Sequence, residues 1–229
     1  MHTTSGFTIL FLPAVVVALP ACTGSGVTTS AIEGGFGPVA SAAWIRKHYG
    51  ADVSEGLVLT NVSGFCEKYN AMTDALVAFR AAIDAMTTAD TTCSSLTDPF
   101  LDAVDAAAAM YPPATNLLLL DTVFSPGAHQ VGDDAGGRLE TYSGLSASSL
   151  SEPWDPAGSI ETHCGLPESP IDFLSPDPET ELEIWSGVLR IASVTETSLD
   201  GSFKGALEGD GGAISAHFQA EPCEFNAPE

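Results

Sequence analysis

The residues with the clearest chemistry in this chain are its cysteines. The 229 residues include five, which are Cys22, Cys66, Cys93, Cys164 and Cys223. In an oxidising compartment such thiols pair into disulfides, which act as staples in exported domains. An odd number leaves one cysteine without an intramolecular partner. We expect that residue to be Cys22, because an apolar segment directly precedes it.

Residues 7–21 form this segment, an almost uninterrupted apolar run of 15 residues, FTILFLPAVVVALPA. A transmembrane helix needs about 20 apolar residues, so the run is typical of a signal peptide that is removed on export. Its last residues, Leu19-Pro20-Ala21-Cys22, resemble the lipobox of bacterial lipoproteins. The resemblance implies cleavage after residue 21 and a lipid on Cys22. The alternative is an ordinary secretory peptide that leaves a free thiol.

The other four cysteines permit three disulfide pairings. A helix over residues 67–88 would be about 30 Å long, whereas bonded cysteines have Cα atoms within about 7 Å of each other. This disfavours Cys66–Cys93. Cys164–Cys223 is attractive because it would tie a proline-rich segment to the last strand, while Cys66–Cys164 and Cys66–Cys223 stay open.

Carboxylates are the most abundant functional groups. Thirty Asp and Glu residues against seven Lys and Arg give a formal net charge of -23, which excludes nucleic-acid binding because such a surface repels phosphate backbones. Acidic pairs in expected loops could coordinate Ca²⁺, and the weak candidates are Asp133, Asp134, Glu208 and Asp210. They follow no calcium-loop motif, so a solvated acidic surface is the simpler interpretation.

Catalytic motifs are missing from the sequence. It contains no G-x-S-x-G, phosphate loop, H-E-x-x-H or dinucleotide fingerprint, and its histidines lie in separate segments. We therefore predict no catalytic residue, no metal and no cofactor. The expected function is a non-catalytic, surface-tethered binding or structural module of unassigned ligand, with a protein or a glycan as candidate partner. Its only expected membrane contact is its lipid anchor. The alternatives are a hydrolase that uses paired carboxylates and a calcium-stabilised structural module.

The predicted elements form one domain after a flexible, Gly/Ser/Thr-rich tether at residues 22–37. Apolar residues recur every three or four positions from Glu67 to Thr88, the spacing of a helix. A second helix is predicted from Pro99 to Tyr111, with Thr97 or Asp98 as its cap. Alternation and β-forming residues predict strands over 39–49, 56–64, 116–124 and 138–142, and residues 146–178 read as a long loop.

The C-terminal block is the strongest structural signal. Strands at 183–195 and 202–207 precede a GDGG turn and an alternating segment in which Ile214, Ala216, Phe218 and Ala220 share one face. This antiparallel meander, from Gly187 to Cys223, resembles the C-terminal strands of lipoproteins of unassigned function from myxobacteria and related bacteria. The resemblance implies a cell-envelope β-sandwich-like domain, and an outer-membrane lipoprotein is the expected location. The predicted fold is mainly β (α+β), with a helical hairpin inserted at about 67–111.

Overall fold

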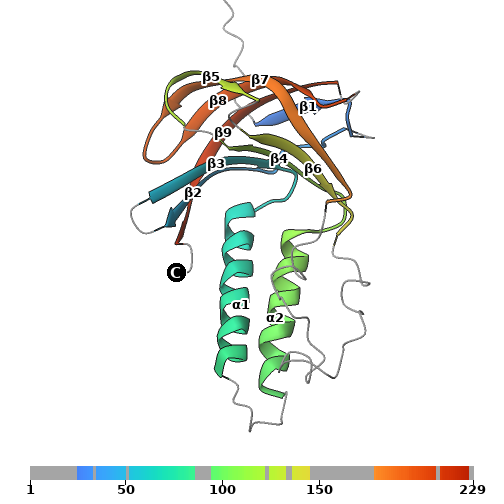
Figure 1. Ribbon diagram of the computed structural model, residues 1–229, viewed down its shortest axis with the longest axis vertical. Helices are drawn as coiled ribbons and strands as arrows, with labels where there is room; N and C mark the ends of the chain where they lie inside the picture. The colour runs from blue at the N-terminus through green and yellow to red at the C-terminus, as the bar shows by residue number, and fades with distance from the viewer. Residues whose placement is uncertain are drawn as a thin grey trace, which may run out of the picture.

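The structure is a computed structural model that describes residues 25–32, 35–49, 52–85, 94–121, 124–132, 136–144, 178–209 and 212–226. These residues form nine strands and two helices (Figure 1). The elements are β1 (Gly26–Thr29), β2 (Ser41–Tyr49), β3 (Asp52–Thr60), α1 (Phe65–Ala85), α2 (Ser94–Met110), β4 (Thr115–Asp121), β5 (Gly127–Val131), β6 (Gly137–Tyr142), β7 (Thr180–Val194), β8 (Leu199–Leu207) and β9 (Ala213–Asn226).

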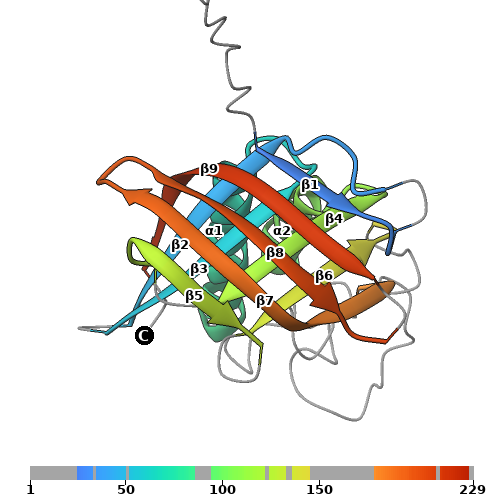
Figure 2. The same ribbon diagram turned by 90° about the horizontal axis from the view of Figure 1, so that it is seen from above.

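Seven of the strands close into a barrel. Its order around the ring is β2-β3-β4-β6-β7-β8-β9, and the parallel pairing of β9 with β2 completes it. Every other neighbouring pair in the ring is antiparallel. The remaining strands, β1 and β5, add to β9 and β7 outside the ring (Figure 2). The expectation of a mainly β fold with two helices is confirmed.

The closure depends on the two longest strands, β7 and β9. Along one edge, β7 pairs first with β6 and then with β5, and β9 pairs first with β1 and then with β2. Each strand therefore passes from one sheet into the other, which is how sheets join at barrel corners. The register between β7 and β8 shifts between Ile184 and Ser186, a β-bulge that suits such a bend. The fold is thus a closed barrel, whereas the sequence predicted a sandwich of two separate packed sheets.

Apolar side chains from alternate strand positions fill the barrel interior. The largest fully buried ones include Leu57, Leu118, Leu139 and Phe203. The Phe203 ring lies against Gly187 on the neighbouring strand, where an added Cβ would come within 2.5 Å of that ring. Glycine is required there because any larger residue would collide with the core.

The C-terminal meander agrees with its sequence pattern. Ile214, Ala216, Phe218 and Ala220 are buried, as the alternation predicts. Periodicity and turn residues are local signals, so a strand with one solvent-exposed face can be predicted without knowledge of the strands it pairs with.

The expected tether does not extend to residue 37. Strand β1 pairs with the outer edge of β9 from Gly26 to Thr29, and Phe36 is buried in the barrel core. The short GVTT segment contains β-branched residues, and its pairing with β9 satisfies backbone groups that a free tether would leave to water. The folded part therefore includes residues that the sequence pattern assigned to the tether.

The two helices form a hairpin inserted between the neighbouring strands β3 and β4. They lie side by side and project from the barrel (Figure 1). Their apolar faces meet each other and the outer face of the sheet in a second core, which includes Val58, Phe65, Phe79 and Met110. In the described part of the chain, neither helix is long and apolar enough to span a membrane.

Helix α2 begins earlier than predicted. It starts at Ser94 rather than at Pro99, which lies inside the helix. Proline lacks an N–H and so removes one helical hydrogen bond. The tertiary packing of Leu96, which is buried in the second core, compensates for that loss and extends the helix before the proline.

A disulfide joins Cys66 in the first turn of α1 to Cys223 in β9, with their Cα atoms 5.7 Å apart. This is one of the pairings that the sequence left open, and it excludes Cys164–Cys223. The bond ties the start of the hairpin to the last strand of the barrel. Long-range pairing of this kind depends on the closed topology, which the cysteine spacing does not encode.

Candidate ligand-binding cleft

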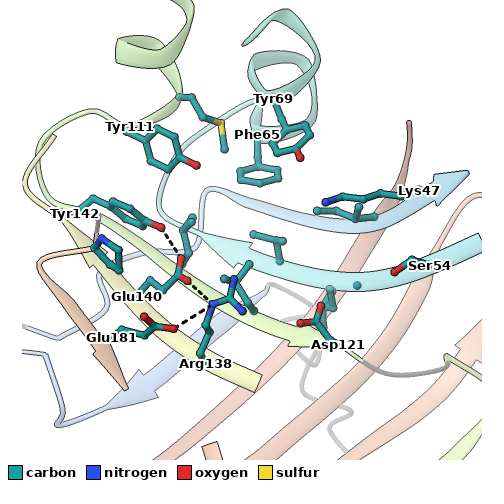
Figure 3. A pocket seen from close by; sticks show the side chains of 18 of the residues that line it. Lys47, Ser54, Phe65, Tyr69, Tyr111, Asp121, Arg138, Glu140, Tyr142 and Glu181 are labelled. Atoms are coloured by element: carbon teal, nitrogen blue, oxygen red, sulfur yellow. Dashed lines mark hydrogen bonds and ion pairs between the residues drawn. The ribbon is translucent and has the colours of Figure 1, made fainter. Parts of the chain in front are cut away.

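A cleft of about 520 Å³ lies where the hairpin meets the barrel. Its floor is the outer face of β2, β3, β4 and β6. The helix ends nearest the barrel form the wall that faces this floor (Figure 3). The volume falls in the range of about 300–1,000 Å³ that is typical of small-molecule sites. The side chains that define its character are Lys47, Ser54, Phe65, Tyr69, Tyr111, Asp121, Arg138, Glu140, Tyr142 and Glu181.

Two pairs of aromatic rings form one side of the cleft. Phe65 and Tyr69 lie one helical turn apart on α1, with ring centroids 5.9 Å apart. Tyr111 follows the last residue of α2 and contacts Tyr142 of β6, with ring centroids 4.8 Å apart. Such offset or tilted contacts are the favourable geometries for aromatic pairs. The aromatic wall, defined here as these four residues, therefore spans both helices and the barrel.

Local hydrogen bonds hold the helix ends that carry this wall. At the start of α1, the N–H of Phe65 donates to Oγ of Ser41 on β2 at 3.3 Å, which satisfies one of the helix's unpaired donors. At the end of α2, Pro112 and Pro113 stop the helix. The Thr115 hydroxyl then donates to the carbonyl oxygen of Pro112 at 2.6 Å. The chain thus turns sharply into β4 and leaves Tyr111 beside the barrel.

A polar network lies on the β6 part of the cleft floor, next to the aromatic wall, and shares Tyr142 with it. Arg138, Glu140 and Tyr142 occupy alternate positions on β6 and so share its outer face. One carboxylate oxygen of Glu140 accepts a hydrogen bond from Nε of Arg138, and the other accepts one from the Tyr142 hydroxyl at 2.6 Å. Glu140 is only 5% exposed. Both of its oxygens are therefore used by the protein itself.

The network changes the titration of two of its members. Burial, together with the hydrogen bond to Glu140, raises the pKa of Tyr142 far above that of a free tyrosine. Burial opposes the charge on Arg138, but Glu140 outweighs it and raises the pKa of the guanidinium. Tyr142 therefore stays protonated as a donor, and Arg138 stays a cation.

Two further carboxylates line the cleft. Glu181 on β7 is paired in register with Glu140, and its Oε1 lies 3.6 Å from Nε of Arg138. Asp121 at the end of β4 is exposed, and one of its carboxylate oxygens lies 3.2 Å from where a Cβ on Gly56 would be. Glycine at position 56 thus leaves room both for this carboxylate and for the cleft.

Charges of opposite sign follow one another along the floor. Figure 3 shows Lys47, Asp121 and Arg138 in succession, with Glu181 and Glu140 next to Arg138. Nζ of Lys47 also lies 5.8 Å from the centroid of the Tyr69 ring. The cleft therefore offers hydrogen-bond donors and acceptors in alternation, opposite an aromatic wall.

A separate ionic cluster lies at one end of the barrel, outside the cleft's polar network. Glu224 of β9 accepts a hydrogen bond from Nη1 of Arg46 at 2.6 Å, and its other oxygen lies 2.7 Å from Nε2 of His48. The hydrogen bond with His48, with Arg46 as a further cause, lowers the pKa of Glu224. Arg46 also lies 3.7 Å from Glu55. This cluster neutralises charge where strands β2, β3 and β9 lie next to one another.

The residues singled out from the sequence have different outcomes. Cys66 and Cys223 form the disulfide, whereas Cys22, Cys93 and Cys164 lie outside the described residues. The weak calcium candidates Asp133, Asp134 and Asp210 lie outside them as well, and Glu208 is exposed at the end of β8. Among the residues that the structure describes, no three His, Cys, Asp or Glu side chains are grouped to hold a metal ion.

The cleft residues were not predicted as a site. The alternating segment Arg138-Leu139-Glu140-Thr141-Tyr142 is the one signal that was visible, because it predicts a strand with Arg, Glu and Tyr on a single face. An outer strand face of this kind is ordinarily solvated. Only the folded structure shows that the helical hairpin covers this face of β6. Searches against known protein families, curated proteins and solved structures gave no match.

Proposed function

We propose that the protein is a non-catalytic cell-envelope lipoprotein that binds a small ligand in the cleft between its barrel and its helical hairpin. The observation that carries the binding function is the buried Glu140, held by Arg138 and Tyr142 at one side of a 520 Å³ cleft. A carboxylate buried beside a half-exposed arginine, such as Glu140 beside Arg138, contributes little net stability compared with an apolar residue of similar volume. A polar network in that position is therefore better explained by ligand recognition than by folding.

The lipid anchor is supported by the lipobox-like segment that ends at Cys22. Three peptide units separate Cys22 from Ser25, and an extended chain advances about 3.5 Å per residue. A lipid on Cys22 would hold the barrel within about 10 Å of the membrane surface. The resemblance to myxobacterial lipoproteins supports the outer membrane as the location.

Intact mass spectrometry of the protein from its membrane fraction tests the anchor. The expected mass begins at Cys22 and carries two or three acyl chains. Four cysteines should become alkylatable only after reduction, because Cys66–Cys223 leaves Cys93 and Cys164 to pair with each other. An unprocessed or unacylated chain would contradict the anchor.

Ligand screening by thermal shift tests the binding function. The screen uses the mature chain against sugars, amino acids, nucleotides and fatty acids, since a ligand that binds only the folded state stabilises it by an amount that grows with the logarithm of ligand concentration above Kd. Gly56→Val places a side chain on the floor of the cleft, where its Cβ lies 3.2 Å from the movable carboxylate of Asp121 and 3.8 Å from the carbonyl oxygen of Leu120. Gly26→Val is the matched control, because a Cβ there meets no atom within 4 Å.

A ligand of the cleft should raise Tm in the wild type and in Gly26→Val, and not in Gly56→Val. If no compound distinguishes these proteins, the cleft is not a binding site and the proposed function fails.

A hydrolase is the second candidate, because Glu140 and Glu181 face each other across neighbouring strands. Directly opposed residues have Cβ atoms about 5 Å apart, and retaining glycosidases hold two carboxyl groups at a similar separation. However, Arg138 contacts both carboxylates, and Tyr142 holds the second oxygen of Glu140. These contacts favour a positioning role for Glu140, and an assay for hydrolysis distinguishes the two functions.

A further inference from the structure

We propose that the ligand of the cleft is a neutral saccharide, bound with one sugar ring between the aromatic wall and the polar floor. This inference rests on the proposed binding function and names the class of its ligand. Its basis is that the two sides of the cleft differ in chemistry (Figure 3).

The aromatic wall suits the apolar side of a sugar ring. Phe65, Tyr111 and Tyr142 are buried. The Phe65 ring contacts Tyr69, and the Tyr111 ring contacts Tyr142. An aromatic ring is negative on its faces, so it attracts the C–H groups that cover one side of a pyranose. A rigid wall of this kind binds with little loss of side-chain freedom.

The floor suits the hydroxyl groups at the ring's edge. Nε of Arg138 is held by Glu140, and within the described residues its terminal nitrogens make no hydrogen bond. The guanidinium has five N–H donors in a fixed plane, so those on the terminal nitrogens remain to donate to a ligand. The exposed carboxylate of Asp121, likewise without a hydrogen-bond partner in the described part of the chain, can accept.

The alternation of charge favours a neutral ligand over an ion. A ligand anion near Arg138 would lie beside Asp121 and Glu181, while a cation near Asp121 would lie between Lys47 and Arg138. Either ion would meet a like charge next to its partner, which opposes binding. A hydroxyl both donates and accepts, so a polyhydroxyl compound can pair with successive groups along the floor without that repulsion.

Titration calorimetry on the mature chain tests this assignment. The probes are the neutral disaccharides maltose, cellobiose and N,N′-diacetylchitobiose, with glucuronate and glucosamine as charged sugars and glutamate and arginine as charged compounds of another class. At least one neutral sugar should bind, at least tenfold more tightly than either charged sugar. Gly56→Val should abolish that binding, and Gly26→Val should retain it.

Variants of the floor test which groups recognise the ligand. Arg138→Lys keeps the charge but loses the planar fork of donors, so affinity should fall at least tenfold. Asp121→Asn should weaken binding several-fold, because the amide accepts fewer hydrogen bonds. Glu196→Gln is the matched control for charge, since Glu196 is exposed in the turn between β7 and β8 and is not among the residues that line the cleft. It should bind as the wild type does.

The outcomes separate this inference from the function on which it rests. If charged compounds bind to the wild type but not to Gly56→Val, and neutral sugars do not bind, the saccharide assignment is overturned and the cleft remains a binding site. If nothing binds in the cleft, both proposals fail. Release of reducing ends from a bound disaccharide would support saccharide recognition and overturn the non-catalytic function.

Discussion

The two faces of strand β6 are buried for different reasons. Leu139 points into the barrel and is 1% exposed, while the next residue, Glu140, points into the cleft and is 5% exposed. The inner face is covered by apolar side chains from the rest of the barrel. The outer face places a carboxylate among aromatic rings and needs two hydrogen bonds to do so. Both residues are therefore buried, but only the burial of Leu139 is explained by folding alone. The burial of Glu140 needs a further reason.

Leu139→Ala is expected to have the largest effect on stability. Truncating a buried leucine leaves a cavity and costs about 2–5 kcal/mol. Urea denaturation should show a lower midpoint with an unchanged slope. A loss below about 1 kcal/mol would mean that the interior of the barrel relaxes around the gap, and the contrast between the two faces would weaken.

Removal of the disulfide is expected to have the next largest effect. Cys66→Ala with Cys223→Ala frees a link across 157 residues of chain, and a native disulfide contributes about 2–4 kcal/mol. Because the bond fixes the start of α1 to the barrel, the cleft ligand should also bind more weakly. Denaturation and calorimetry on the same variant measure both effects. Unchanged affinity would show that packing alone positions the aromatic wall.

A double variant on the outer face is expected to cost little. Glu140→Leu removes the buried carboxylate, and Tyr142→Phe removes the hydroxyl that depended on it. Arg138, whose side chain is 44% exposed, can then be solvated. Replacing a buried polar network with apolar groups is often close to neutral, so we expect a change within about 1 kcal/mol in denaturation, together with loss of ligand binding. A cost as large as that of Leu139→Ala would show that the network serves the fold.

The sequence predicted which residues fill the inside of the barrel far better than it predicted which residues line the cleft on its outer face. Alternation at Ile214, Ala216 and Phe218 reports which side of a strand is buried, and helical spacing reports the stripe on α1, because both are local patterns. The parallel pairing of β9 with β2 joins residues far apart in the chain, and the cover over Glu140 comes from both helices. Such contacts depend on closure of the whole barrel. The cysteine count likewise predicted disulfides, while the choice of Cys66–Cys223 needed the fold.

Tyr142 should give the stability of the protein a dependence on alkaline pH. Its pKa is raised above the ordinary value of 10.0, chiefly by burial and then by Glu140. Its stabilising contribution is therefore present below pH 10 and is lost as the pH rises above 10, because the unfolded tyrosine ionises there and the folded one does not. Absorbance of tyrosinate should rise further when the protein unfolds at high pH, and this additional rise should be smaller in Tyr142→Phe than in the wild type.

The smallest expected effect concerns the exposed ionic cluster around Glu224, which sharpens the contrast with the buried Glu140. The pKa of Glu224 is lowered from 4.5 by its hydrogen bond with His48 and by Arg46. A lowered pKa means that the stabilisation is present above about pH 4.5 and is lost as the pH falls below that value. The Glu224 side chain is 48% exposed, so solvent screening keeps the effect small. Glu224→Gln should flatten the acid limb of a pH–stability curve slightly, and Glu221→Gln, a neighbour on β9 that takes no part in this cluster, should not. An equal change in both variants would show that the acid limb reflects overall charge rather than this ion pair.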